Sequence, residues 1–208
     1  ICGCVNGFCV SKLNVPPFIA TLAMMNVARG LAYVATDAKP VFGLPESFGF
    51  VGLRKIGPVP VSIVLMIIVL VVAYVILSKT AYGRHIYAVG SNQEVAKLTG
   101  INVVKIKFSV YIICGFLSAL GGLVLASKLQ NGQATAAQGY ELNAIAAVAM
   151  GGTSMSGGRG GIVQTIFGLF VIGIINNALS MLGVSSYWQT VAMGVIILID
   201  VIMDHFRK

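Results

Sequence analysis

The sequence has 208 residues, of which 57% are hydrophobic and 10% charged, and its mean hydropathy is +0.93. Soluble domains carry about 25% charged residues, so this composition excludes a soluble protein and indicates an integral membrane protein. The formal net charge of +8 would suggest nucleic acid as a partner of a soluble protein. Here the basic residues cluster beside apolar runs, where orientation signals and anionic lipid account for them. We therefore expect membrane lipid, and no nucleic acid, among the partners.

Five apolar runs are predicted to cross the membrane, since a crossing helix needs about 20 apolar residues. In chain order they are residues 18–36, 59–78, 108–127, 162–182 and 187–203, and residues 1–10 are typical of the end of another span. The third run repeats Ser118, Gly122 and Ala126 every four residues, which predicts close helix packing. The predicted fold is an all-α, multi-span helical bundle, a single transmembrane domain over residues 1–208. Because the chain opens at Ile1 inside an apolar segment, we expect it to lack its N-terminal helices.

Residues 37–58 connect the first two spans and are rich in glycine and proline, with Phe42, Phe48 and Phe50 between them. Such a segment does not form a long helix. It is either a structured extracytoplasmic loop that meets a partner, or a linker at the membrane interface with phenylalanines as lipid anchors.

Residues 79–107 form a polar segment with five basic residues and a single acid, Glu94. Ser91 and Glu94 have the spacing of a capping box, and Gly100 stands where a helix is commonly ended by glycine. We predict a short helix over residues 91–99 that serves as a cytoplasmic docking element.

Orientation follows from the basic residues near the ends of the spans. If residues 79–107 are cytoplasmic, nine basic residues fall on the cytoplasmic side and four on the outside. This count requires that the short apolar segment 144–150 crosses the membrane. That segment is too short to cross alone and runs into a glycine-rich stretch, so we predict a broken or re-entrant helix. Its glycines are Gly151, Gly152, Gly157 and Gly158. The stretch lacks the Gly-Lys-Ser/Thr ending of a phosphate loop, which argues against nucleotide binding.

Polar residues within or beside the spans suit either a translocation path or interhelical hydrogen bonds. They are Asn26, Arg29, Asn143, Asn176, Asn177 and Gln189. An arginine in mid-span costs about 2.5–3.5 kcal/mol on insertion scales, so Arg29 either lines the path or bonds helix-end carbonyls as a structural residue. Asp200 and Asp204, with Arg207 nearby, are predicted to be interface charges.

Catalytic and metal-binding patterns are missing from the sequence. His85 and His205 stand alone at the ends of spans, and no serine has a plausible base nearby. The cysteines lie in apolar runs without the spacing of a zinc site or a disulfide framework, and we expect small buried hydrophobic residues at Cys2, Cys4, Cys9 and Cys114. The sequence therefore predicts neither an enzyme nor a bound metal.

Four blocks of sequence together resemble membrane permeases of ribose-type ABC sugar importers. They are AVGSN at residues 88–92 with Ala96 and Gly100-Ile101, ELNAIAA at 141–147 running into GGTS at 151–154 and Gly157-Gly158, the stretch from Asn176-Asn177 to LGVSSY at 182–187, and VPPFI at 15–19. The likeness spans essentially the whole chain, and the first two blocks together are more specific than either alone.

The resemblance implies a multi-pass permease in the plasma (inner) membrane of a prokaryote that translocates a monosaccharide such as ribose. It implies a second permease copy, an extracytoplasmic sugar-binding protein, and an ABC ATPase subunit that carries ATP and Mg while this chain binds no cofactor. The residues that would couple to the ATPase are Gly90, Ser91, Asn92, Glu94, Ala96, Lys97 and Gly100.

Two other functions remain open. An ion-coupled secondary transporter or channel would share the spans and the broken helix, although it normally needs ionisable groups within the membrane. A membrane anchor without transport is disfavoured by the many polar residues in the spans. The sequence does not identify the sugar.

Overall fold

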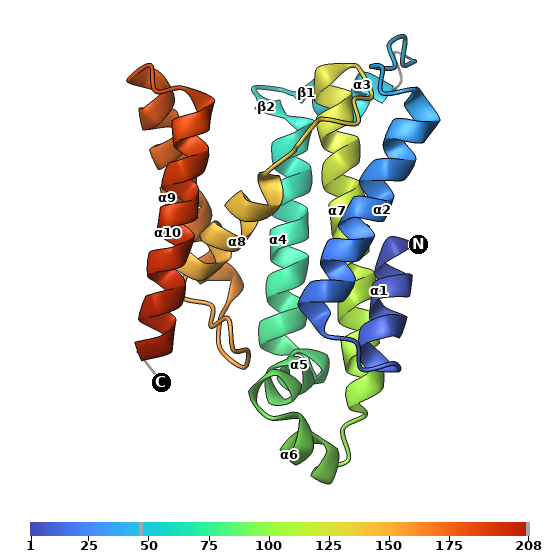
Figure 1. Ribbon diagram of the computed structural model, residues 1–208, viewed down its shortest axis with the longest axis vertical. Helices are drawn as coiled ribbons and strands as arrows, with labels where there is room; N and C mark the ends of the chain where they lie inside the picture. Colours follow the sequence, from blue (N-terminus) through green and yellow to red (C-terminus); the bar gives the residue numbers. More distant parts are fainter. Residues whose placement is uncertain (46–47, 207–208) are drawn as a thin grey trace. The chain divides into compact units, whose positions relative to one another are not determined.

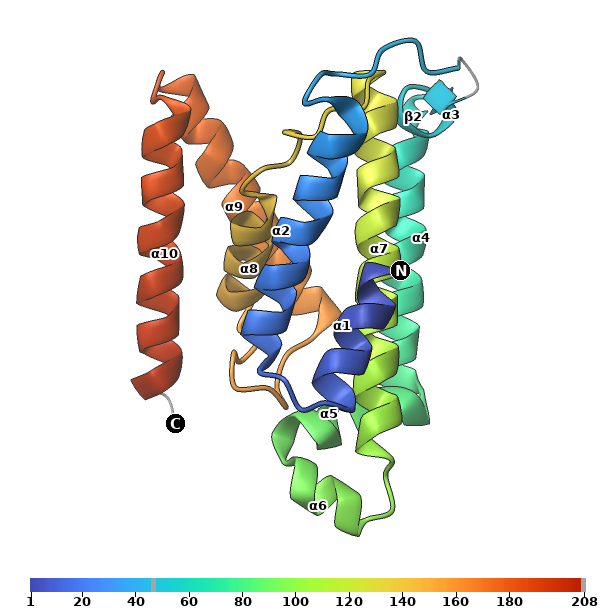
Figure 2. The same ribbon diagram turned by 45° about the vertical axis from the view of Figure 1, so that its right-hand side comes forward.

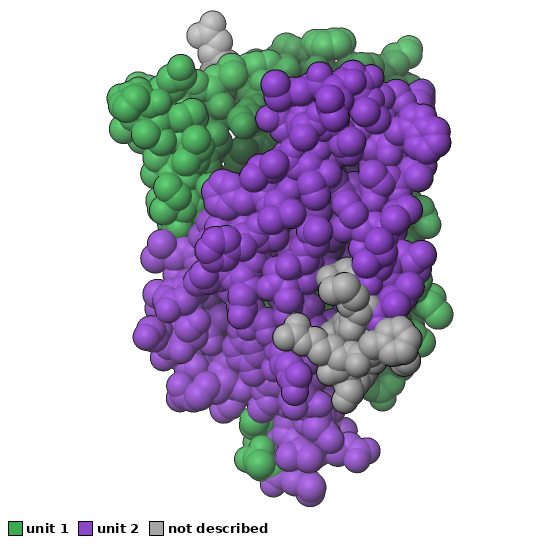
Figure 3. All heavy atoms as spheres, turned by 90° about the vertical axis from the view of Figure 1, so that its left-hand side faces the viewer, with its two compact units in different colours: residues 1–69, 99–136 green, residues 70–98, 137–208 purple. Residues whose placement is uncertain are grey.

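The computed structural model describes residues 1–45 and 48–206, with the side chains of residues 200, 201 and 203–206 outside the described part. The chain divides into two compact units, shown in different colours in Figure 3. Unit 1 comprises residues 1–69 and 99–136, and unit 2 comprises residues 70–98 and 137–208. The predicted interface charges Asp200, Asp204 and Arg207, and the histidine at 205, lie outside the described side chains.

Unit 1 is built around the long helix α7 (Val103–Leu129), with α1 (Cys2–Ser11), α2 (Pro17–Thr36) and the first part of α4 (Val61–Lys79). Helix α1 lies along the lower half of α7 in both ribbon views (Figures 1 and 2). The two helices approach at glycines, since a Cβ added to Gly3 would lie 3.2 Å from the Cα of Gly115. Helix α7 is therefore closely packed at Gly115, whereas Ser118 and Gly122 of the predicted ridge are exposed.

The connection between α2 and α4 is held on the end of α7 by Ser127. The Ser127 hydroxyl, which is 1% exposed, donates to the carbonyl of Phe48 (2.6 Å) and accepts from the N–H of Gly52 (2.8 Å). These bonds fix the short helix α3 (Gly49–Gly52), after which β1 (Lys55–Ile56) and β2 (Val59–Pro60) form an antiparallel hairpin. The described part of the loop is thus structured, as one of the two interpretations requires, and its partner remains a prediction.

Unit 2 contains α5 (Ala81–Ser91), α6 (Gln93–Leu98), α8 (Tyr140–Met150), α9 (Ile162–Met181) and α10 (Ser186–Phe206). Helix α8 packs against both α9 and α10. The buried residues of this contact form one apolar cluster of Ala146, Ala147, Ile172 and Met193. The helices α8 and α9 come so close that a side chain at Gly168 would collide with the carbonyl of Ala147.

The broken helix is present, and its break has a clear cause. Gly152 has a φ of +80°, which favours glycine and ends α8. Its N–H donates to Ala149 (2.7 Å) and the N–H of Thr153 donates to Val148 (3.2 Å), as in a Schellman motif. At about 1.5 Å per residue, the 11 residues of α8 extend roughly half of the hydrocarbon thickness.

Four helices within the described residues have the length and apolarity to cross a membrane: α2, α4, α7 and α9. The all-α multi-span fold is therefore confirmed. The remaining predicted span belongs to α10. The described apolar part of α10, Ser186–Ile199, is shorter than the 18 residues taken as the minimum for a span. Helix α7 begins five residues before the predicted start at 108, because the Asn102 side chain caps it by accepting from the N–H of Lys105 (3.0 Å).

The cysteines differ from expectation. All four are free, but Cys2, Cys4 and Cys114 are exposed and Cys9 is partly buried, so the prediction of buried positions was wrong. The cause is that exposed faces of membrane helices are themselves apolar, so a hydrophobic neighbourhood in the sequence does not report burial in the protein.

Candidate functional site

A polar pocket of about 420 Å³ lies within unit 2. It is lined from α8, α9 and α10 and from the two residues before α8: Gln138, Gly139, Tyr140, Leu142, Asn143, Asn176, Ser186, Gln189, Thr190 and Met193. Its volume falls in the range of about 300–1,000 Å³ that is usual for small-molecule sites. None of these ten side chains is acidic or basic.

One wall of the pocket is fixed by Gln189 of α10. Its Nε2 donates to the Ser180 hydroxyl (3.2 Å) and to the carbonyl of Val184 (3.0 Å). Ser180 in turn donates to the carbonyl of Asn176 (2.8 Å). This network ties α10 to the end of α9 and holds the Gln189 carboxamide at the pocket, where a rigid polar group costs less entropy on binding.

The lining suits an uncharged, hydroxyl-rich molecule. Carboxamides and hydroxyls offer both donors and acceptors, as the hydroxyls of a sugar do, whereas a charged solute would need a counter-charge. Met193 and Leu142 supply an apolar surface for the carbon skeleton. The geometry therefore supports weak binding of a neutral polar solute.

Three of the six predicted path residues are brought together here: Asn143, Asn176 and Gln189. Asn177 is exposed on α9 and does not line the pocket. Asn26 and Arg29 belong to α2 of unit 1, where Asn26 is exposed and Arg29 half-buried, and neither is part of the lining.

Sequence reasoning missed four polar lining residues: Gln138, Tyr140, Ser186 and Thr190. A signal for two of them existed, because Ser186, Gln189, Thr190 and Met193 recur at helical spacing along one face of α10. Gln138 precedes α8, and no periodicity marks it.

The predicted docking segment consists of two helices rather than one. Ser91 is the last residue of α5, and α6 starts at Gln93. The cap of α6 is Asn92, whose Oδ1 accepts from the N–H groups of Glu94 (2.9 Å) and Val95 (3.1 Å). The predicted capping box at Ser91 was therefore wrong, because Ser91 is still helical while Asn92 has the extended backbone (φ −155°) that a cap requires.

Other features of this segment agree with the prediction. Gly100 follows α6 with a φ of +83°, as expected for a glycine that ends a helix. Helix α6 contacts α5, and its buried residue is Ala96, at 2% exposed. Glu94, Lys97 and Leu98 are exposed, the last at 87%. The short helix thus combines an apolar side chain with both signs of charge on its accessible surface.

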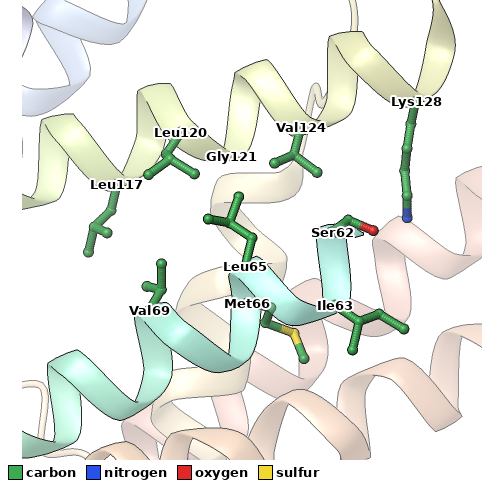
Figure 4. A pocket seen from close by; sticks show the side chains of 10 residues that line it. All are labelled: Ser62, Ile63, Leu65, Met66, Val69, Leu117, Leu120, Gly121, Val124 and Lys128. Carbon is green, nitrogen blue, oxygen red and sulfur yellow. The ribbon is translucent and has the colours of Figure 1, made fainter. Parts of the chain in front are cut away.

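A second hollow, of about 400 Å³, lies between α4 and α7 in unit 1 (Figure 4). Leu65 points from α4 toward α7, and Leu120 and Val124 point back toward α4. Ser62 and Lys128 are its only polar side chains and lie at one end. This groove offers almost no hydrogen bonds to a sugar.

Comparison with known proteins decides the family. The family described as "Branched-chain amino acid transport system / permease component" matches residues 1–200. The chain belongs to this permease family. It is a multi-pass protein of the inner membrane, in agreement with its four span-length helices.

Relatives named for sugars are similar over nearly the whole chain. The chain is 47% identical to the ribose import permease protein RbsC of Bacillus subtilis (strain 168), over 98% of its length. It is 45% identical to the protein of the same name from Escherichia coli (strain K12), over 99%. The L-arabinose transport system permease protein AraH of Escherichia coli (strain K12) is 38% identical over 98%. The resemblance seen in the sequence blocks is thereby confirmed.

The chain spans 64%, 65% and 62% of the lengths of these three relatives, respectively. No solved structure gives a significant match.

Proposed function

We propose that this chain is the transmembrane part of an ATP-driven ABC importer that moves a monosaccharide, with ribose or a similar sugar as the substrate class. The observation that carries the proposal is the neutral pocket of carboxamides and hydroxyls in unit 2. Its support is the similarity to permeases whose names specify ribose and L-arabinose, although the family description names branched-chain amino acids. An amino acid carries two charges, and the pocket offers no counter-charge to either.

In this proposal Asn143, Asn176 and Gln189 are path residues, and Tyr140 and Thr190 join them. Each contributes one or two hydrogen-bonding groups, so a sugar is held only weakly, as transport requires if it is to leave again. The earlier assignments of Asn26, Arg29 and Asn177 to the path have no support from this pocket.

We further propose that α5 and α6 receive the ATPase subunit, with Glu94, Lys97 and the exposed Leu98 on the docking surface. The ATPase would carry ATP and Mg. An extracytoplasmic binding protein would deliver the sugar, and a second permease copy would complete the path. A rigid, capped α6 suits the task, because a frayed helix would absorb the motion of the ATPase instead of passing it on.

The proposal is tested with the complete permease, its ATPase and its binding protein in proteoliposomes. Uptake of labelled ribose, arabinose, galactose, inositol and leucine is measured with and without ATP. We expect ATP-dependent uptake of a sugar and none of leucine. Uptake that follows an imposed ion gradient without ATP would support the secondary-transporter alternative, and leucine uptake would overturn the sugar assignment.

Replacement of the cap gives a sharper test of the docking role. Asn92→Ala removes the side-chain oxygen that accepts from Glu94 and Val95, which costs a helix about 1 kcal/mol. We expect ATP-dependent uptake to fall roughly fivefold. Ser91→Ala is the matched comparison, since Ser91 does not cap α6, and it should lower uptake less than Asn92→Ala does. Equal uptake by the two variants would contradict the docking role of α6.

A further inference from the structure

A side-chain hydrogen bond joins α5 to the glycine-rich loop between α8 and α9. The hydroxyl of Tyr87 donates to the carbonyl of Gly160 over 3.0 Å, and the bond is partly buried. The two residues are 73 positions apart in the sequence, so this bond joins distant parts of unit 2.

Beside this bond the two backbones touch without intervening side chains. A Cβ added to Gly90 would lie 2.8 Å from the amide nitrogen of Gly158. A Cβ added to Gly158 would lie 2.8 Å from the Cα of Ser91, and one added to Gly157 would lie 2.7 Å from the carbonyl oxygen of Gly90. Only glycine allows this approach at all three positions, and we call Gly157 and Gly158, on which Gly90 of α5 lies, the glycine seat.

The loop that carries the seat is itself closed by hydrogen bonds. The N–H of Ser154 donates to Arg159 (3.1 Å), and the N–H of Gly157 donates to Ser154 (3.0 Å). On the far side, Thr165 of α9 donates both its N–H and its hydroxyl to the carbonyl of Gly161 (3.0 Å each). The loop is therefore tied to the start of α9, as the Schellman motif ties it to the end of α8.

These connections form a continuous route within unit 2. It runs from α6 through α5 and the glycine seat to α8 and α9, which pack at Gly168 and carry Asn143 and Asn176 into the polar pocket. Packed glycine contacts transmit displacement well, because there are no flexible side chains between the backbones to absorb it.

We propose that Tyr87 is a positioning residue that locks α5 onto the glycine seat, so that motion of α5 and α6 moves the α8–α9 wall of the sugar pocket. This inference rests on the proposed function. We call the contact of α5 with the glycine seat, held by Tyr87, the joint. Tyr87 belongs to α5 and does not line the pocket, and its part is to keep α5 and the loop together during transport.

Tyr87→Phe tests the proposal, since it removes only the hydroxyl. The complete permease, with its ATPase and binding protein, is placed in proteoliposomes, and sugar uptake and ATP hydrolysis are measured per assembled complex. We expect ATP hydrolysis to stay within twofold of wild type. Sugar transported per ATP should fall about fivefold, because that factor corresponds to the loss of one neutral hydrogen bond. Tyr74→Phe is the control, because Tyr74 of α4 is 39% exposed and has no hydrogen bond to a described residue.

A pair of glycine variants tests the seat independently. Gly158 and Gly152 have similar backbone angles, φ +75° and +80°, so alanine is comparably strained at both. Only at Gly158 would the new Cβ meet another segment, since nothing lies within 4 Å of a Cβ at Gly152. We expect Gly158→Ala to lower sugar transported per ATP clearly more than Gly152→Ala does, because only Gly158→Ala adds a clash with α5 to the shared backbone strain.

The outcomes distinguish a failure of the joint from a failure of the proposed transport function. If the wild-type complex shows no ATP-driven uptake, both the proposed function and the joint fail. If the wild type transports and Tyr87→Phe keeps its ratio of sugar to ATP, the joint alone is overturned. A fall of uptake and hydrolysis in equal proportion would also overturn it, because that result indicates lost docking or folding rather than lost transmission.

Discussion

The groove of unit 1 and the pocket of unit 2 have nearly the same volume, about 400 and 420 Å³, and opposite linings. Eight of the ten groove residues are apolar or glycine, with Ser62 and Lys128 at one end. In the pocket the carboxamides and hydroxyls of α8, α9 and α10 predominate. Because the two volumes are nearly equal, the two hollows are distinguished by the chemistry of their linings and not by their size.

The two linings differ in their energetic cost to a membrane protein. An apolar groove costs nothing in a membrane, because lipid or another helix fills it. A cluster of carboxamides does have a cost, since each buried polar group without a hydrogen-bonding partner destabilises the folded protein by about 1–3 kcal/mol. In the proposed function, a polar solute in the pocket would supply hydrogen-bonding partners to Asn143 and Asn176.

The largest effect is expected from the contact that forms the pocket. Gly168→Leu would drive a side chain into the carbonyl of Ala147 and separate α8 from α9. Overpacking of this kind costs about 3 kcal/mol or more. We expect little monodisperse permease in detergent and a strongly lowered melting temperature.

Gly121→Leu is the matched change in the groove. A Cβ at Gly121 has nothing within 4 Å, so the added side chain extends into open space on α7. The variant should yield as much folded permease as wild type. If both leucine variants fold equally well, the α8–α9 contact is not what holds unit 2 together.

An intermediate effect is expected from the polar lining. The double variant Asn143→Leu/Asn176→Leu removes two hydrogen-bonding side chains, each worth about 1 kcal/mol to a bound sugar. We expect sugar uptake at limiting concentration to fall roughly 30-fold at normal protein levels. The control is Met66→Leu in the groove, a volume-conserving change, which should leave uptake within twofold. Normal uptake by the double variant would show that the sugar passes elsewhere.

Much of the fold could be predicted from the sequence because membrane helices are specified by apolar length alone. The run predicted at 162–182 is helix Ile162–Met181, and the run at 59–78 is helix Val61–Lys79. The break after α8 was also predictable, since glycines at 151 and 152 end a helix that is too short to cross. These features are local, and local signals are sufficient for them.

The sites were less predictable because they depend on which residues meet in space. Ser91 and Asn92 are both good helix caps, and their roles are decided by where α5 ends, which no spacing rule gives. Asn176 and Asn177 are adjacent and chemically identical, yet only Asn176 lines the pocket. The contact of Gly90 with Gly158 leaves no trace in either segment taken alone.

The smallest effect is expected from the network that holds the pocket wall. Gln189→Leu removes the hydrogen bonds from Nε2 to Ser180 and to the carbonyl of Val184. Two neutral hydrogen bonds contribute about 1–2 kcal/mol to the free energy of unfolding. For a protein of this size, their loss should lower the melting temperature by a few degrees. Asn177→Ala is the control, because Asn177 is exposed on α9 and outside the pocket, and its melting temperature should match wild type. If Gln189→Leu melts like wild type but transports poorly, Gln189 acts on the sugar directly rather than by tying α10 to α9.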